Sequence, residues 1–317
     1  MKRIGNLYQK IYSLENLRLA DEIARKGKRN SYGVKFHDKN REENILKLHK
    51  QLKEKTFKTS KYEIFKIYEP KEREIYRLPY YPDRIMHHAV MNVMEPIWME
   101  IFTTDTYSCI KGRGIHSCGE KLKTALRENV GETKYCLKLD IKKFYPTIDH
   151  DILKSILGRK IKDQNLMWLL GEVIDSAAGV PIGNYLSQYF ANLYLAYFDH
   201  WIKEEKARKY YYRYADDIVI LSHSKEDLHG LFQKIKAYMK DNLKLVIKGN
   251  YQVFPVSARS IDFVGYRFYH THTLLRKKIK KSFAKAVAHD HSKKRLASYA
   301  GWAKHCNSKH LIQKLAA

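Results

Sequence analysis

Cysteine is scarce in this chain of 317 residues, and its four cysteines form no recognisable metal-binding or disulfide pattern. Cys109, Cys118, Cys136 and Cys306 contain no C-x-x-C pair and are not spaced as in a small disulfide-rich domain. This pattern excludes a readable structural zinc site and a disulfide scaffold. We therefore expect reduced thiols in a cytoplasmic protein.

Long apolar runs are also missing. No segment approaches the roughly 20 apolar residues that a membrane span needs. The first residues, MKRIGNLYQKIYSL, lack an apolar run of signal-peptide length. These absences predict a soluble protein that is not exported and has no membrane partner.

Acidic side chains are few relative to basic ones. The chain has 60 Lys and Arg against 34 Asp and Glu, a formal net charge of +26 that is spread along the sequence. Such a surface attracts a polyanion. The 24 tyrosines supply rings on which bases can stack, although many of them also suit strands and core positions. The hydrophobic content of 44% indicates a globular protein, and 317 residues are enough for two or three subdomains. We expect this protein to bind nucleic acid.

The scarce acidic residues include an adjacent pair, Asp216 and Asp217, between two runs rich in Tyr, Ile and Val. This composition favours strands, so residues 210–221 are predicted to form a β-hairpin with the acid pair at its tip. Neighbouring carboxylates repel each other and are placed either in water or around a cation. A solvated Asp-Asp turn is the structural alternative for the pair taken alone.

A third carboxylate, Asp140, ends a run in which Leu137 and Leu139 alternate with polar residues, as in a buried strand. Two-metal phosphoryl transfer needs several anionic oxygens to hold two Mg²⁺ ions about 3.5–4 Å apart. Asp140, Asp216 and Asp217 are therefore candidate catalytic metal ligands. The nearby Asp149 is better interpreted as a helix cap.

Cations cluster where a triphosphate or a nucleic-acid backbone would bind. Residues 62–78 alternate as two strands around a turn at 69–72, and Lys71, Arg73 and Arg84 would hold the triphosphate. Asp83 fits a cap of the helix that follows. Three further segments are basic. Loop 25–29 would contact nucleic acid or form a solvated face, and the glycine-flanked pair Lys111 and Arg113 would approach a polyanion. A basic helical end would bind a duplex through Lys277, Lys278, Lys280 and Lys281.

The remaining periodicity predicts helices over much of residues 1–60, a helix after the turn at Gly183, and an amphipathic helix over 225–242. Strands are predicted for 243–247 and 260–269. Gly265, within the second of these, would allow a close backbone approach.

Together and in order, these motifs resemble those of reverse transcriptases over about residues 60–270. Residues 214–217, Tyr-Ala-Asp-Asp, match the family's Tyr-x-Asp-Asp box, and Asp140 with Phe144 and Tyr145 resembles the box that supplies its first metal-binding aspartate. Segments 71–90, 111–117 and 263–266 look like the fingers motif, the second motif and the motif that closes the palm. Residues 182–188, Ile-Gly-x-x-x-Ser-Gln, are similar to diversity-generating retroelement reverse transcriptases, whereas group II intron and retroviral enzymes carry Gln-Gly-x-x-x-Ser-Pro.

The resemblance implies an α+β, right-hand polymerase fold. It would comprise a helical N-terminal extension (1–60), fingers and a palm with an antiparallel sheet (61–270), and a basic helical thumb (271–317). The implied activity is RNA-directed DNA polymerisation with two Mg²⁺ ions, copying a template-repeat RNA into adenine-mutagenised cDNA in a bacterial or phage-infected cell. Implied partners are template RNA, the RNA–cDNA duplex, dNTP and a small basic accessory variability protein, usually a homopentamer.

Residue by residue, the resemblance assigns the metal ligands to Asp140, Asp216, Asp217 and the carbonyl of Ile141, with Asp216 the principal ligand of the pair. Tyr145, beside Phe144, matches the ring that excludes a ribose 2′-hydroxyl. The nucleotide pocket would include Ile182, Gly183 and Gln188, with Ile182 in place of a glutamine. Segment 80–83 is one residue longer than the family pattern, and His87 stands where glutamine is common.

Two other functions fit the same residues. A retron- or defence-type reverse transcriptase would make a different cDNA with the same three aspartates. A non-catalytic RNA-binding protein on a polymerase fold would keep the basic surface without the chemistry.

Overall fold

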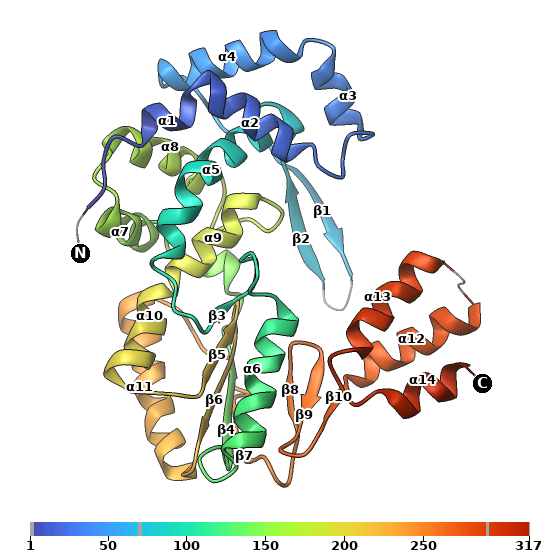
Figure 1. Ribbon diagram of the computed structural model, residues 1–317. Helices are drawn as coiled ribbons and strands as arrows, with labels where there is room; N and C mark the ends of the chain where they lie inside the picture. The colour runs from blue at the N-terminus through green and yellow to red at the C-terminus, as the bar shows by residue number, and fades with distance from the viewer. Residues whose placement is uncertain (1–2, 69–71, 290–291, 317) are drawn as a thin grey trace. The chain divides into compact units, whose positions relative to one another are not determined.

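The computed structural model describes residues 3–68, 72–289 and 292–316 (Figure 1). Its elements fall into two compact units, each built from two separate segments of the chain. Unit 1 comprises residues 1–103 and 143–197, and unit 2 comprises residues 104–142 and 198–317. None of the described helices is both long and apolar enough to cross a membrane.

Unit 1 is mainly helical and contains one two-stranded sheet. Its elements are α1 (Tyr8–Tyr12), α2 (Leu14–Ala24), α3 (Tyr32–Asp38), α4 (Arg41–Lys53), β1 (Glu63–Ile67), β2 (Arg73–Arg77), the kinked segment η1 (Tyr80–Arg84), α5 (Ile85–Met99), the short turn η2 (Tyr145–Thr147), α7 (His150–Lys160), α8 (Gln164–Ile174) and α9 (Tyr185–Tyr194).

The N-terminal helices of unit 1 are amphipathic: α1 and α2 pack on α5, and α4 packs on α1 and α2. In α2, Leu17, Ala20 and Ala24 recur at helical spacing and are at most 2% exposed. The side chain of Ser13 accepts a hydrogen bond from the Asn16 N–H and so caps α2. The helical prediction for much of residues 1–60 is therefore confirmed, with helices between Tyr8 and Lys53.

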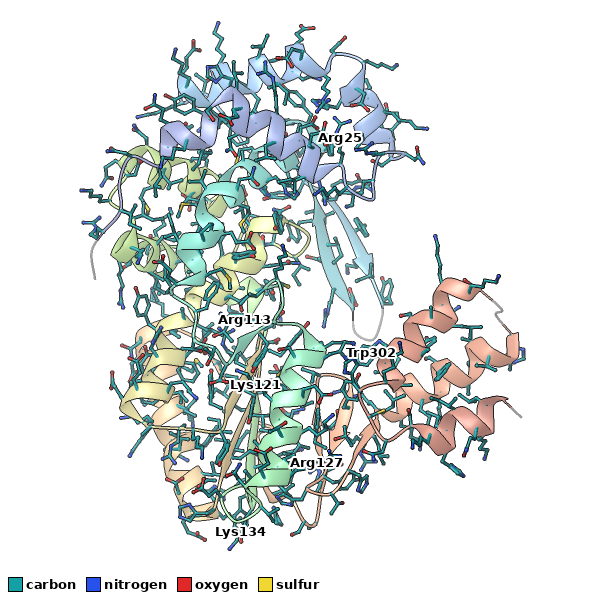
Figure 2. All side chains as sticks on the ribbon, viewed as in Figure 1. Arg25, Arg113, Lys121, Arg127, Lys134 and Trp302 are labelled. Atoms are coloured by element: carbon teal, nitrogen blue, oxygen red, sulfur yellow. The ribbon has the colours of Figure 1, made fainter. Side chains whose placement is uncertain are left out.

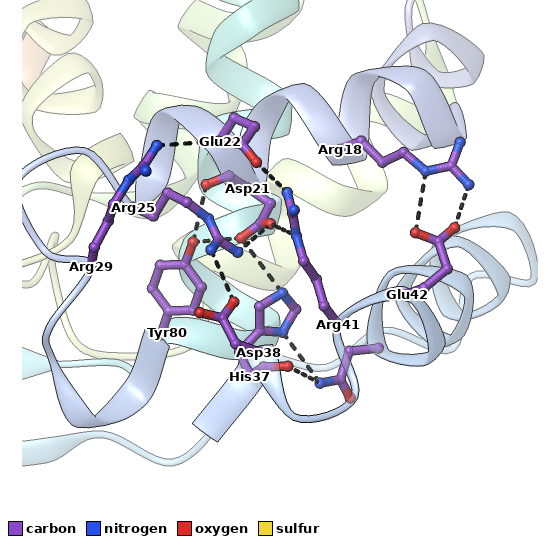
Figure 3. A network of polar contacts seen from close by, with 11 residues as sticks. Arg18, Asp21, Glu22, Arg25, Arg29, His37, Asp38, Arg41, Glu42 and Tyr80 are labelled. Atoms are coloured by element: carbon purple, nitrogen blue, oxygen red, sulfur yellow. Dashed lines mark hydrogen bonds and ion pairs between the residues drawn. The ribbon is translucent and has the colours of Figure 1, made fainter. Parts of the chain in front are cut away.

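A buried carboxylate, Asp21, joins three of these helices to η1 (Figure 3). Its Oδ2 accepts hydrogen bonds from Arg25 Nη2 and from Arg41 Nε, each at 2.6 Å. Its Oδ1 accepts one from the Tyr80 hydroxyl, and His37 Nε2 lies 3.5 Å from the same oxygen. Burial alone would raise the pKa of Asp21, but these hydrogen bonds outweigh burial and hold the pKa well below its usual value.

Strands β1 and β2 form the predicted antiparallel hairpin, with Glu63 opposite Arg77 and Ile67 opposite Arg73. Residues 69–71 of its predicted turn lie outside the described residues. Asp83 does not cap the next helix, so that prediction was wrong. Its side chain is buried and accepts a hydrogen bond from the Ser60 N–H at 2.9 Å.

Unit 2 contains the main sheet, a smaller sheet and the C-terminal helices. Its elements are β3 (Thr106–Tyr107), α6 (Ile115–Glu128), β4 (Tyr135–Asp140), α10 (Ala196–His200, which begins at the boundary with unit 1), the turn η3 (Trp201–Glu205), β5 (Tyr211–Tyr214), β6 (Asp217–Ser222), α11 (Lys225–Leu243), β7 (Gln252–Pro255), β8 (Ile261–Phe263), β9 (Tyr266–Phe268), β10 (Thr273–Leu275), α12 (Lys277–His289), α13 (Lys293–Ala303) and α14 (Lys309–Ala316).

The main sheet has the strand order β3-β5-β6-β4-β7. The pairs β5–β6, β6–β4 and β4–β7 are antiparallel, whereas β3 runs parallel to β5. The predicted antiparallel palm sheet is thus corrected to a mixed one. A two-residue edge strand such as β3 carries no alternation that would have revealed its pairing.

Helices cover both faces of this sheet (Figure 1). Val219 and Leu221 of β6 pack with Leu122 and Leu126 of α6 in one core. The alternate residues of β6 point to the other face, where α11 packs on β4, β6 and β7. Because both faces are buried, the strand is a continuous apolar run rather than a half-polar one.

Two strand predictions after α11 need correction. Segment 243–247 makes a single bridge, between Ile141 and Ile247, and is otherwise not a strand. Segment 260–269 is two strands, β8 and β9, because the chain turns at Gly265, where φ is +90°. A Cβ at Gly265 would lie 2.3 Å from the ring of Trp302 in α13, so the predicted close approach is confirmed.

Candidate active site

The adjacent acid pair lies at the tip of the β5–β6 hairpin, as predicted. Tyr214 pairs with Asp217, which leaves Ala215 and Asp216 in the turn. Ala215 takes a left-handed conformation with φ of +53°, and such positive φ values are typical of two-residue hairpin turns. The carbonyl of Asp216 accepts a hydrogen bond from the Ile141 N–H at 3.3 Å.

The third carboxylate is brought to the same place by the register of the sheet. Strand β4 pairs with β6 so that Asp140 stands directly opposite Asp217. Residues opposite each other in an antiparallel pair have Cα atoms about 4.5–5.5 Å apart. Leu137 and Leu139 are buried, as the alternation predicted. Asp140, Asp216 and Asp217 therefore gather at one end of the sheet, within unit 2.

Two lysines partly neutralise this cluster. Lys248 Nζ lies 2.6 Å from Asp140 Oδ2, and Lys138 Nζ lies 3.6 Å from Asp217 Oδ2. Burial raises the pKa of Asp217 to about 6; Lys138 opposes this rise, and the charges of Asp140 and Asp216 add to it. The pKa of Asp216 is also raised, first by burial and then by Asp140. The cluster thus holds more negative charge than its lysines balance.

The donor set fits a divalent cation. Within the described ranges, no three His, Cys, Asp or Glu side chains converge closely enough to hold a metal as they stand. However, Asp140 Oδ1 and Asp217 Oδ1 are buried and have no hydrogen-bond partner. Carboxylate oxygens are the ligands that Mg²⁺ prefers, and a cation would relieve their repulsion. The N–H of Ile141 faces Asp216, and in an extended residue the C=O points to the same side.

A buried ion pair that was not predicted from the sequence supports the turn of the β5–β6 hairpin. Arg213 of β5 and Asp199 of α10 are both fully buried. Arg213 Nε and Nη2 donate to Asp199 Oδ1 and Oδ2 at 2.7 and 2.6 Å. Arg213 Nη1 also donates to the Ala215 carbonyl at 3.1 Å. This arginine therefore fixes the turn that carries the acid pair.

Lys248 was also missed. It reaches Asp140 because Ile247 bridges Ile141, and the Lys248 N–H donates to the Asp140 carbonyl at 2.9 Å. Only its place directly after the predicted strand 243–247 could have drawn attention to it. The sequence holds no signal for the pairing itself.

The predicted nucleotide-pocket residues belong to unit 1, where Ile182 and Gly183 contact the β1–β2 hairpin. The Ile182 carbonyl accepts a hydrogen bond from the Tyr76 N–H at 2.8 Å. Gly183 has φ of +124°, and a Cβ there would lie 2.6 Å from the Tyr76 carbonyl oxygen. Glycine is therefore required both for its conformation and for the space. Gln188 lies on the exposed side of α9.

Other predicted ligands in unit 1 lie on separate elements. Phe144 is buried, and its ring centroid is 5.5 Å from that of the half-buried Tyr145. Arg73 is exposed on β2, and Arg84 is half-buried at the end of η1. Lys71 lies outside the described residues.

The predicted nucleic-acid ligands in unit 2 are on the surface. Lys111 is exposed in the loop before α6, and the Arg113 carbonyl accepts a hydrogen bond from the Ser108 N–H at 3.2 Å. Figure 2 shows further cations, Lys121 and Arg127, on α6 itself. The exposed lysines of α12 are Lys277, Lys278, Lys280 and Lys281.

Comparison with known proteins gives the fold and the family. The fold resembles that of telomerase from Candida albicans, solved in complex with a fragment of telomeric RNA, with a TM-score of 0.53 and 12% identity over 73% of this chain and 51% of that one. Protein YkfC of Escherichia coli (strain K12) is 26% identical over 250 residues, 64% of this chain and 65% of YkfC.

The retron Ec73 reverse transcriptase of Escherichia coli is 26% identical over 223 residues, 62% of this chain and 68% of the retron enzyme. The chain thus spans slightly less than two thirds of YkfC and slightly more of the retron protein. A family model described as reverse transcriptase (RNA-dependent DNA polymerase) matches residues 69–268, more than half of the chain. The chain belongs to the reverse transcriptase family.

Proposed function

We propose that this protein is an RNA-directed DNA polymerase that extends a primer on an RNA template. The observation that carries the proposal is the register that places Asp140, Asp216 and Asp217 at one end of the sheet, with two buried carboxylate oxygens that have no hydrogen-bond partner. Family membership supports it. A non-catalytic RNA-binding protein has no need of three clustered carboxylates, which are costly to bury without a cation.

In this proposal, Asp140, Asp216, Asp217 and the carbonyl of Ile141 would hold two Mg²⁺ ions, with Asp216 the principal ligand of the adjacent pair. The ions, when bound, activate the primer hydroxyl and neutralise the leaving pyrophosphate. The chain itself positions the reactants, and positioning supplies much of the rate. Tyr145 would lie beneath the sugar and exclude a ribose 2′-hydroxyl.

The substrates in this proposal are template RNA, the growing RNA–cDNA duplex and dNTP. A strongly basic chain that presents exposed lysines on α12 supports a duplex held through its phosphates. Such a contact depends steeply on salt. Lys111 and Arg113, before α6, would add contacts to the backbone, and Arg73 would contact the triphosphate.

We further propose that the enzyme serves a diversity-generating retroelement, with an accessory protein that is a homopentamer. The support is the sequence pattern Ile-Gly-x-x-x-Ser-Gln at residues 182–188. Ile182 cannot form the side-chain hydrogen bond that glutamine would make to an incoming nucleotide. A pocket without that group discriminates less between bases, which fits errors opposite template adenines.

The experiment that tests the polymerase is cDNA synthesis on a defined RNA template with Mg²⁺. Asp216→Asn should reduce synthesis by a factor on the order of 10³, because metal charge stabilisation is worth several kcal/mol. Asp241→Asn, which removes the same charge from an exposed position on α11, is the matched control and should synthesise like the wild type. Equal synthesis by all three proteins would reject the assignment.

Sequencing the cDNA tests the subfamily. Substitutions concentrated at template adenines, and reduced in Ile182→Gln, would support the retroelement proposal. Faithful cDNA would instead favour a retron-type enzyme, the candidate to which the match with retron Ec73 reverse transcriptase points.

A further inference from the structure

Unit 1 contains a second group of polar side chains with buried atoms that have no hydrogen-bond partner. The backbone is helical from Arg84 onward into α5. Arg84, His87 and His88 therefore stand at positions i, i+3 and i+4, which place three side chains on one helix face. His87 and His88 are only 2% and 9% exposed, and Arg84 is half-buried.

This face lacks a counter-ion. Arg84 Nε, His87 Nε2 and His88 Nε2 are buried and have no hydrogen-bond partner. Across the described part of the chain, no carboxylate forms an ion pair with Arg84, and the adjacent Asp83 is hydrogen-bonded to Ser60 instead. Arg84 Nε is a donor, and each histidine Nε2 is a donor in the tautomer that carries its hydrogen there. Buried donors are nearly always satisfied, so these unpaired nitrogens indicate a ligand that supplies acceptor oxygens.

Lys28 adds a second positive charge from the N-terminal segment. It lies in the loop between α2 and α3, and this loop is held against η1 at both ends. At one end the Tyr80 hydroxyl donates to the Asp21 carbonyl at 3.0 Å; at the other, a Cβ on Gly33 would lie 3.0 Å from the Cβ of Tyr80. Burial, and then the charge of Arg84, lower the pKa of Lys28.

The two histidines are neutral at physiological pH. Burial lowers the pKa of His87 to about 3, with the charges of His88 and Arg84 adding to the effect. Burial lowers the pKa of His88 to about 4, with Arg84 and Lys28 contributing. A neutral imidazole can still donate one N–H, so the face combines two cations with neutral donors.

The same face borders the start of α9. The rings of His88 and Tyr185, the first residue of α9, have centroids 4.6 Å apart. Asn184 does not cap this helix, because its side chain donates to the Tyr62 hydroxyl at 3.0 Å. The first amides of a ten-residue helix without a side-chain cap are a further attraction for an anion.

We propose that Lys28, Arg84 and His88 form one phosphate-binding site in unit 1, with Lys28 supplied by the segment that precedes the family match at residues 69–268. The inference rests on the proposed function for the carrier of that phosphate, which is either the backbone of single-stranded RNA or the triphosphate of a nucleotide. Two cations, one of them a fork-shaped guanidinium, suit either carrier.

The test compares two probes on the full chain: a fluorescein-labelled oligouridylate and the fluorescent nucleotide mant-dATP, both followed by fluorescence titration. Lys28→Ala should lower the affinity for the probe that the site binds by about tenfold, which equals about 1.4 kcal/mol. Lys26→Ala removes the same charge from the same loop, in which Lys26 and Lys28 are both exposed, and is the matched control. His88→Gln keeps a neutral donor and should bind better than His88→Leu.

The outcomes separate the two sources of phosphate. Weaker binding of the oligouridylate, with a salt-dependence slope reduced by about one, identifies a backbone phosphate. Weaker binding of mant-dATP alone identifies the triphosphate. The site is rejected if Lys28→Ala binds both probes with the same affinity as Lys26→Ala. It is also rejected if His88→Leu and His88→Gln bind the probes with equal affinity. Neither titration requires synthesis, so a wild-type protein that makes no cDNA yet shows Lys28-dependent binding would reject the proposed function alone.

Discussion

Replacing Asp199 with asparagine should destabilise unit 2 strongly. The carboxylate is fully buried and accepts two hydrogen bonds from Arg213, one from Thr106 Oγ1 at 2.7 Å and one from the Tyr211 hydroxyl. Asparagine keeps the shape but loses the charge and turns an N–H₂ group toward these donors. Arg213, which is 0% exposed, would then be a buried cation without a counter-ion.

The size of the effect follows from that uncompensated charge. Breaking a buried pair by removing one partner costs about 3–5 kcal/mol. Domains are stable by only about 5–15 kcal/mol, so the loss is a large fraction of the total. At about 2–4 °C per kcal/mol for units of this size, the midpoint of thermal unfolding should fall by roughly 6–20 °C.

Urea unfolding followed by circular dichroism, together with thermal unfolding, measures the change. Glu42→Gln is the control, because it removes one partner of the Arg18–Glu42 pair, whose side chains are 50% and 57% exposed. An exposed pair of this kind contributes little, so the control should unfold like the wild type. An Asp199→Asn protein with the same midpoint as that control would refute the role given to Arg213.

Three further predictions concern other positions. Gly183→Ala should slow nucleotide incorporation by about tenfold, because a Cβ would lie 2.6 Å from the Tyr76 carbonyl oxygen and the backbone strain costs about 1–3 kcal/mol. Lys248→Met should raise Mg²⁺ affinity severalfold in calorimetric titrations, because the ammonium group no longer competes for Asp140. Asp21→Asn should be less stable than wild type at pH 7. Because the folded pKa of Asp21 is lowered, this difference should be lost as the pH falls below about 4, in urea unfolding at a series of pH values.

The first two of these variants have a matched control. Gly230→Ala, in α11, meets no atom within 4 Å and should incorporate nucleotide normally. Lys236→Met removes an exposed charge from the same helix and should leave Mg²⁺ affinity unchanged. A stability difference for Asp21→Asn that stays constant down to pH 2 would show that the carboxylate is not the titrating group.

The features predicted correctly are those that depend on short stretches of sequence. Alternation around Leu137 and Leu139 located the strand before Asp140, and the runs flanking Asp216 located its hairpin. Asp149 caps α7 by accepting a hydrogen bond from the Ile152 N–H, as its position before that helix indicated. Local period and capping chemistry are sufficient for such features because they involve neighbouring residues alone.

The missed features depend on residues that are distant in sequence or on backbone conformation. Segment 243–247 reads as a strand, but Leu243 ends α11 and Lys244 turns the chain with a left-handed φ of +50°. The Lys248–Asp140 contact joins residues 108 positions apart. The position of Arg213 in a Tyr-rich strand does not reveal that it forms a buried ion pair with Asp199. No local periodicity encodes pairings of this kind.

The interleaving of the two units has a consequence for folding during synthesis. The first segment of unit 1 ends at residue 103, but α9, whose Tyr189 and Phe190 lie against Trp98 of α5, ends at Tyr194. Chains are synthesised at about 5–20 residues per second, so α9 follows α5 by roughly 5–20 s. During this time the apolar surface of α5 that α9 will cover stays exposed. Strand β4 likewise cannot pair until β6 and β7, its neighbours in the sheet, have been synthesised. Neither unit can therefore close until its second segment has been synthesised.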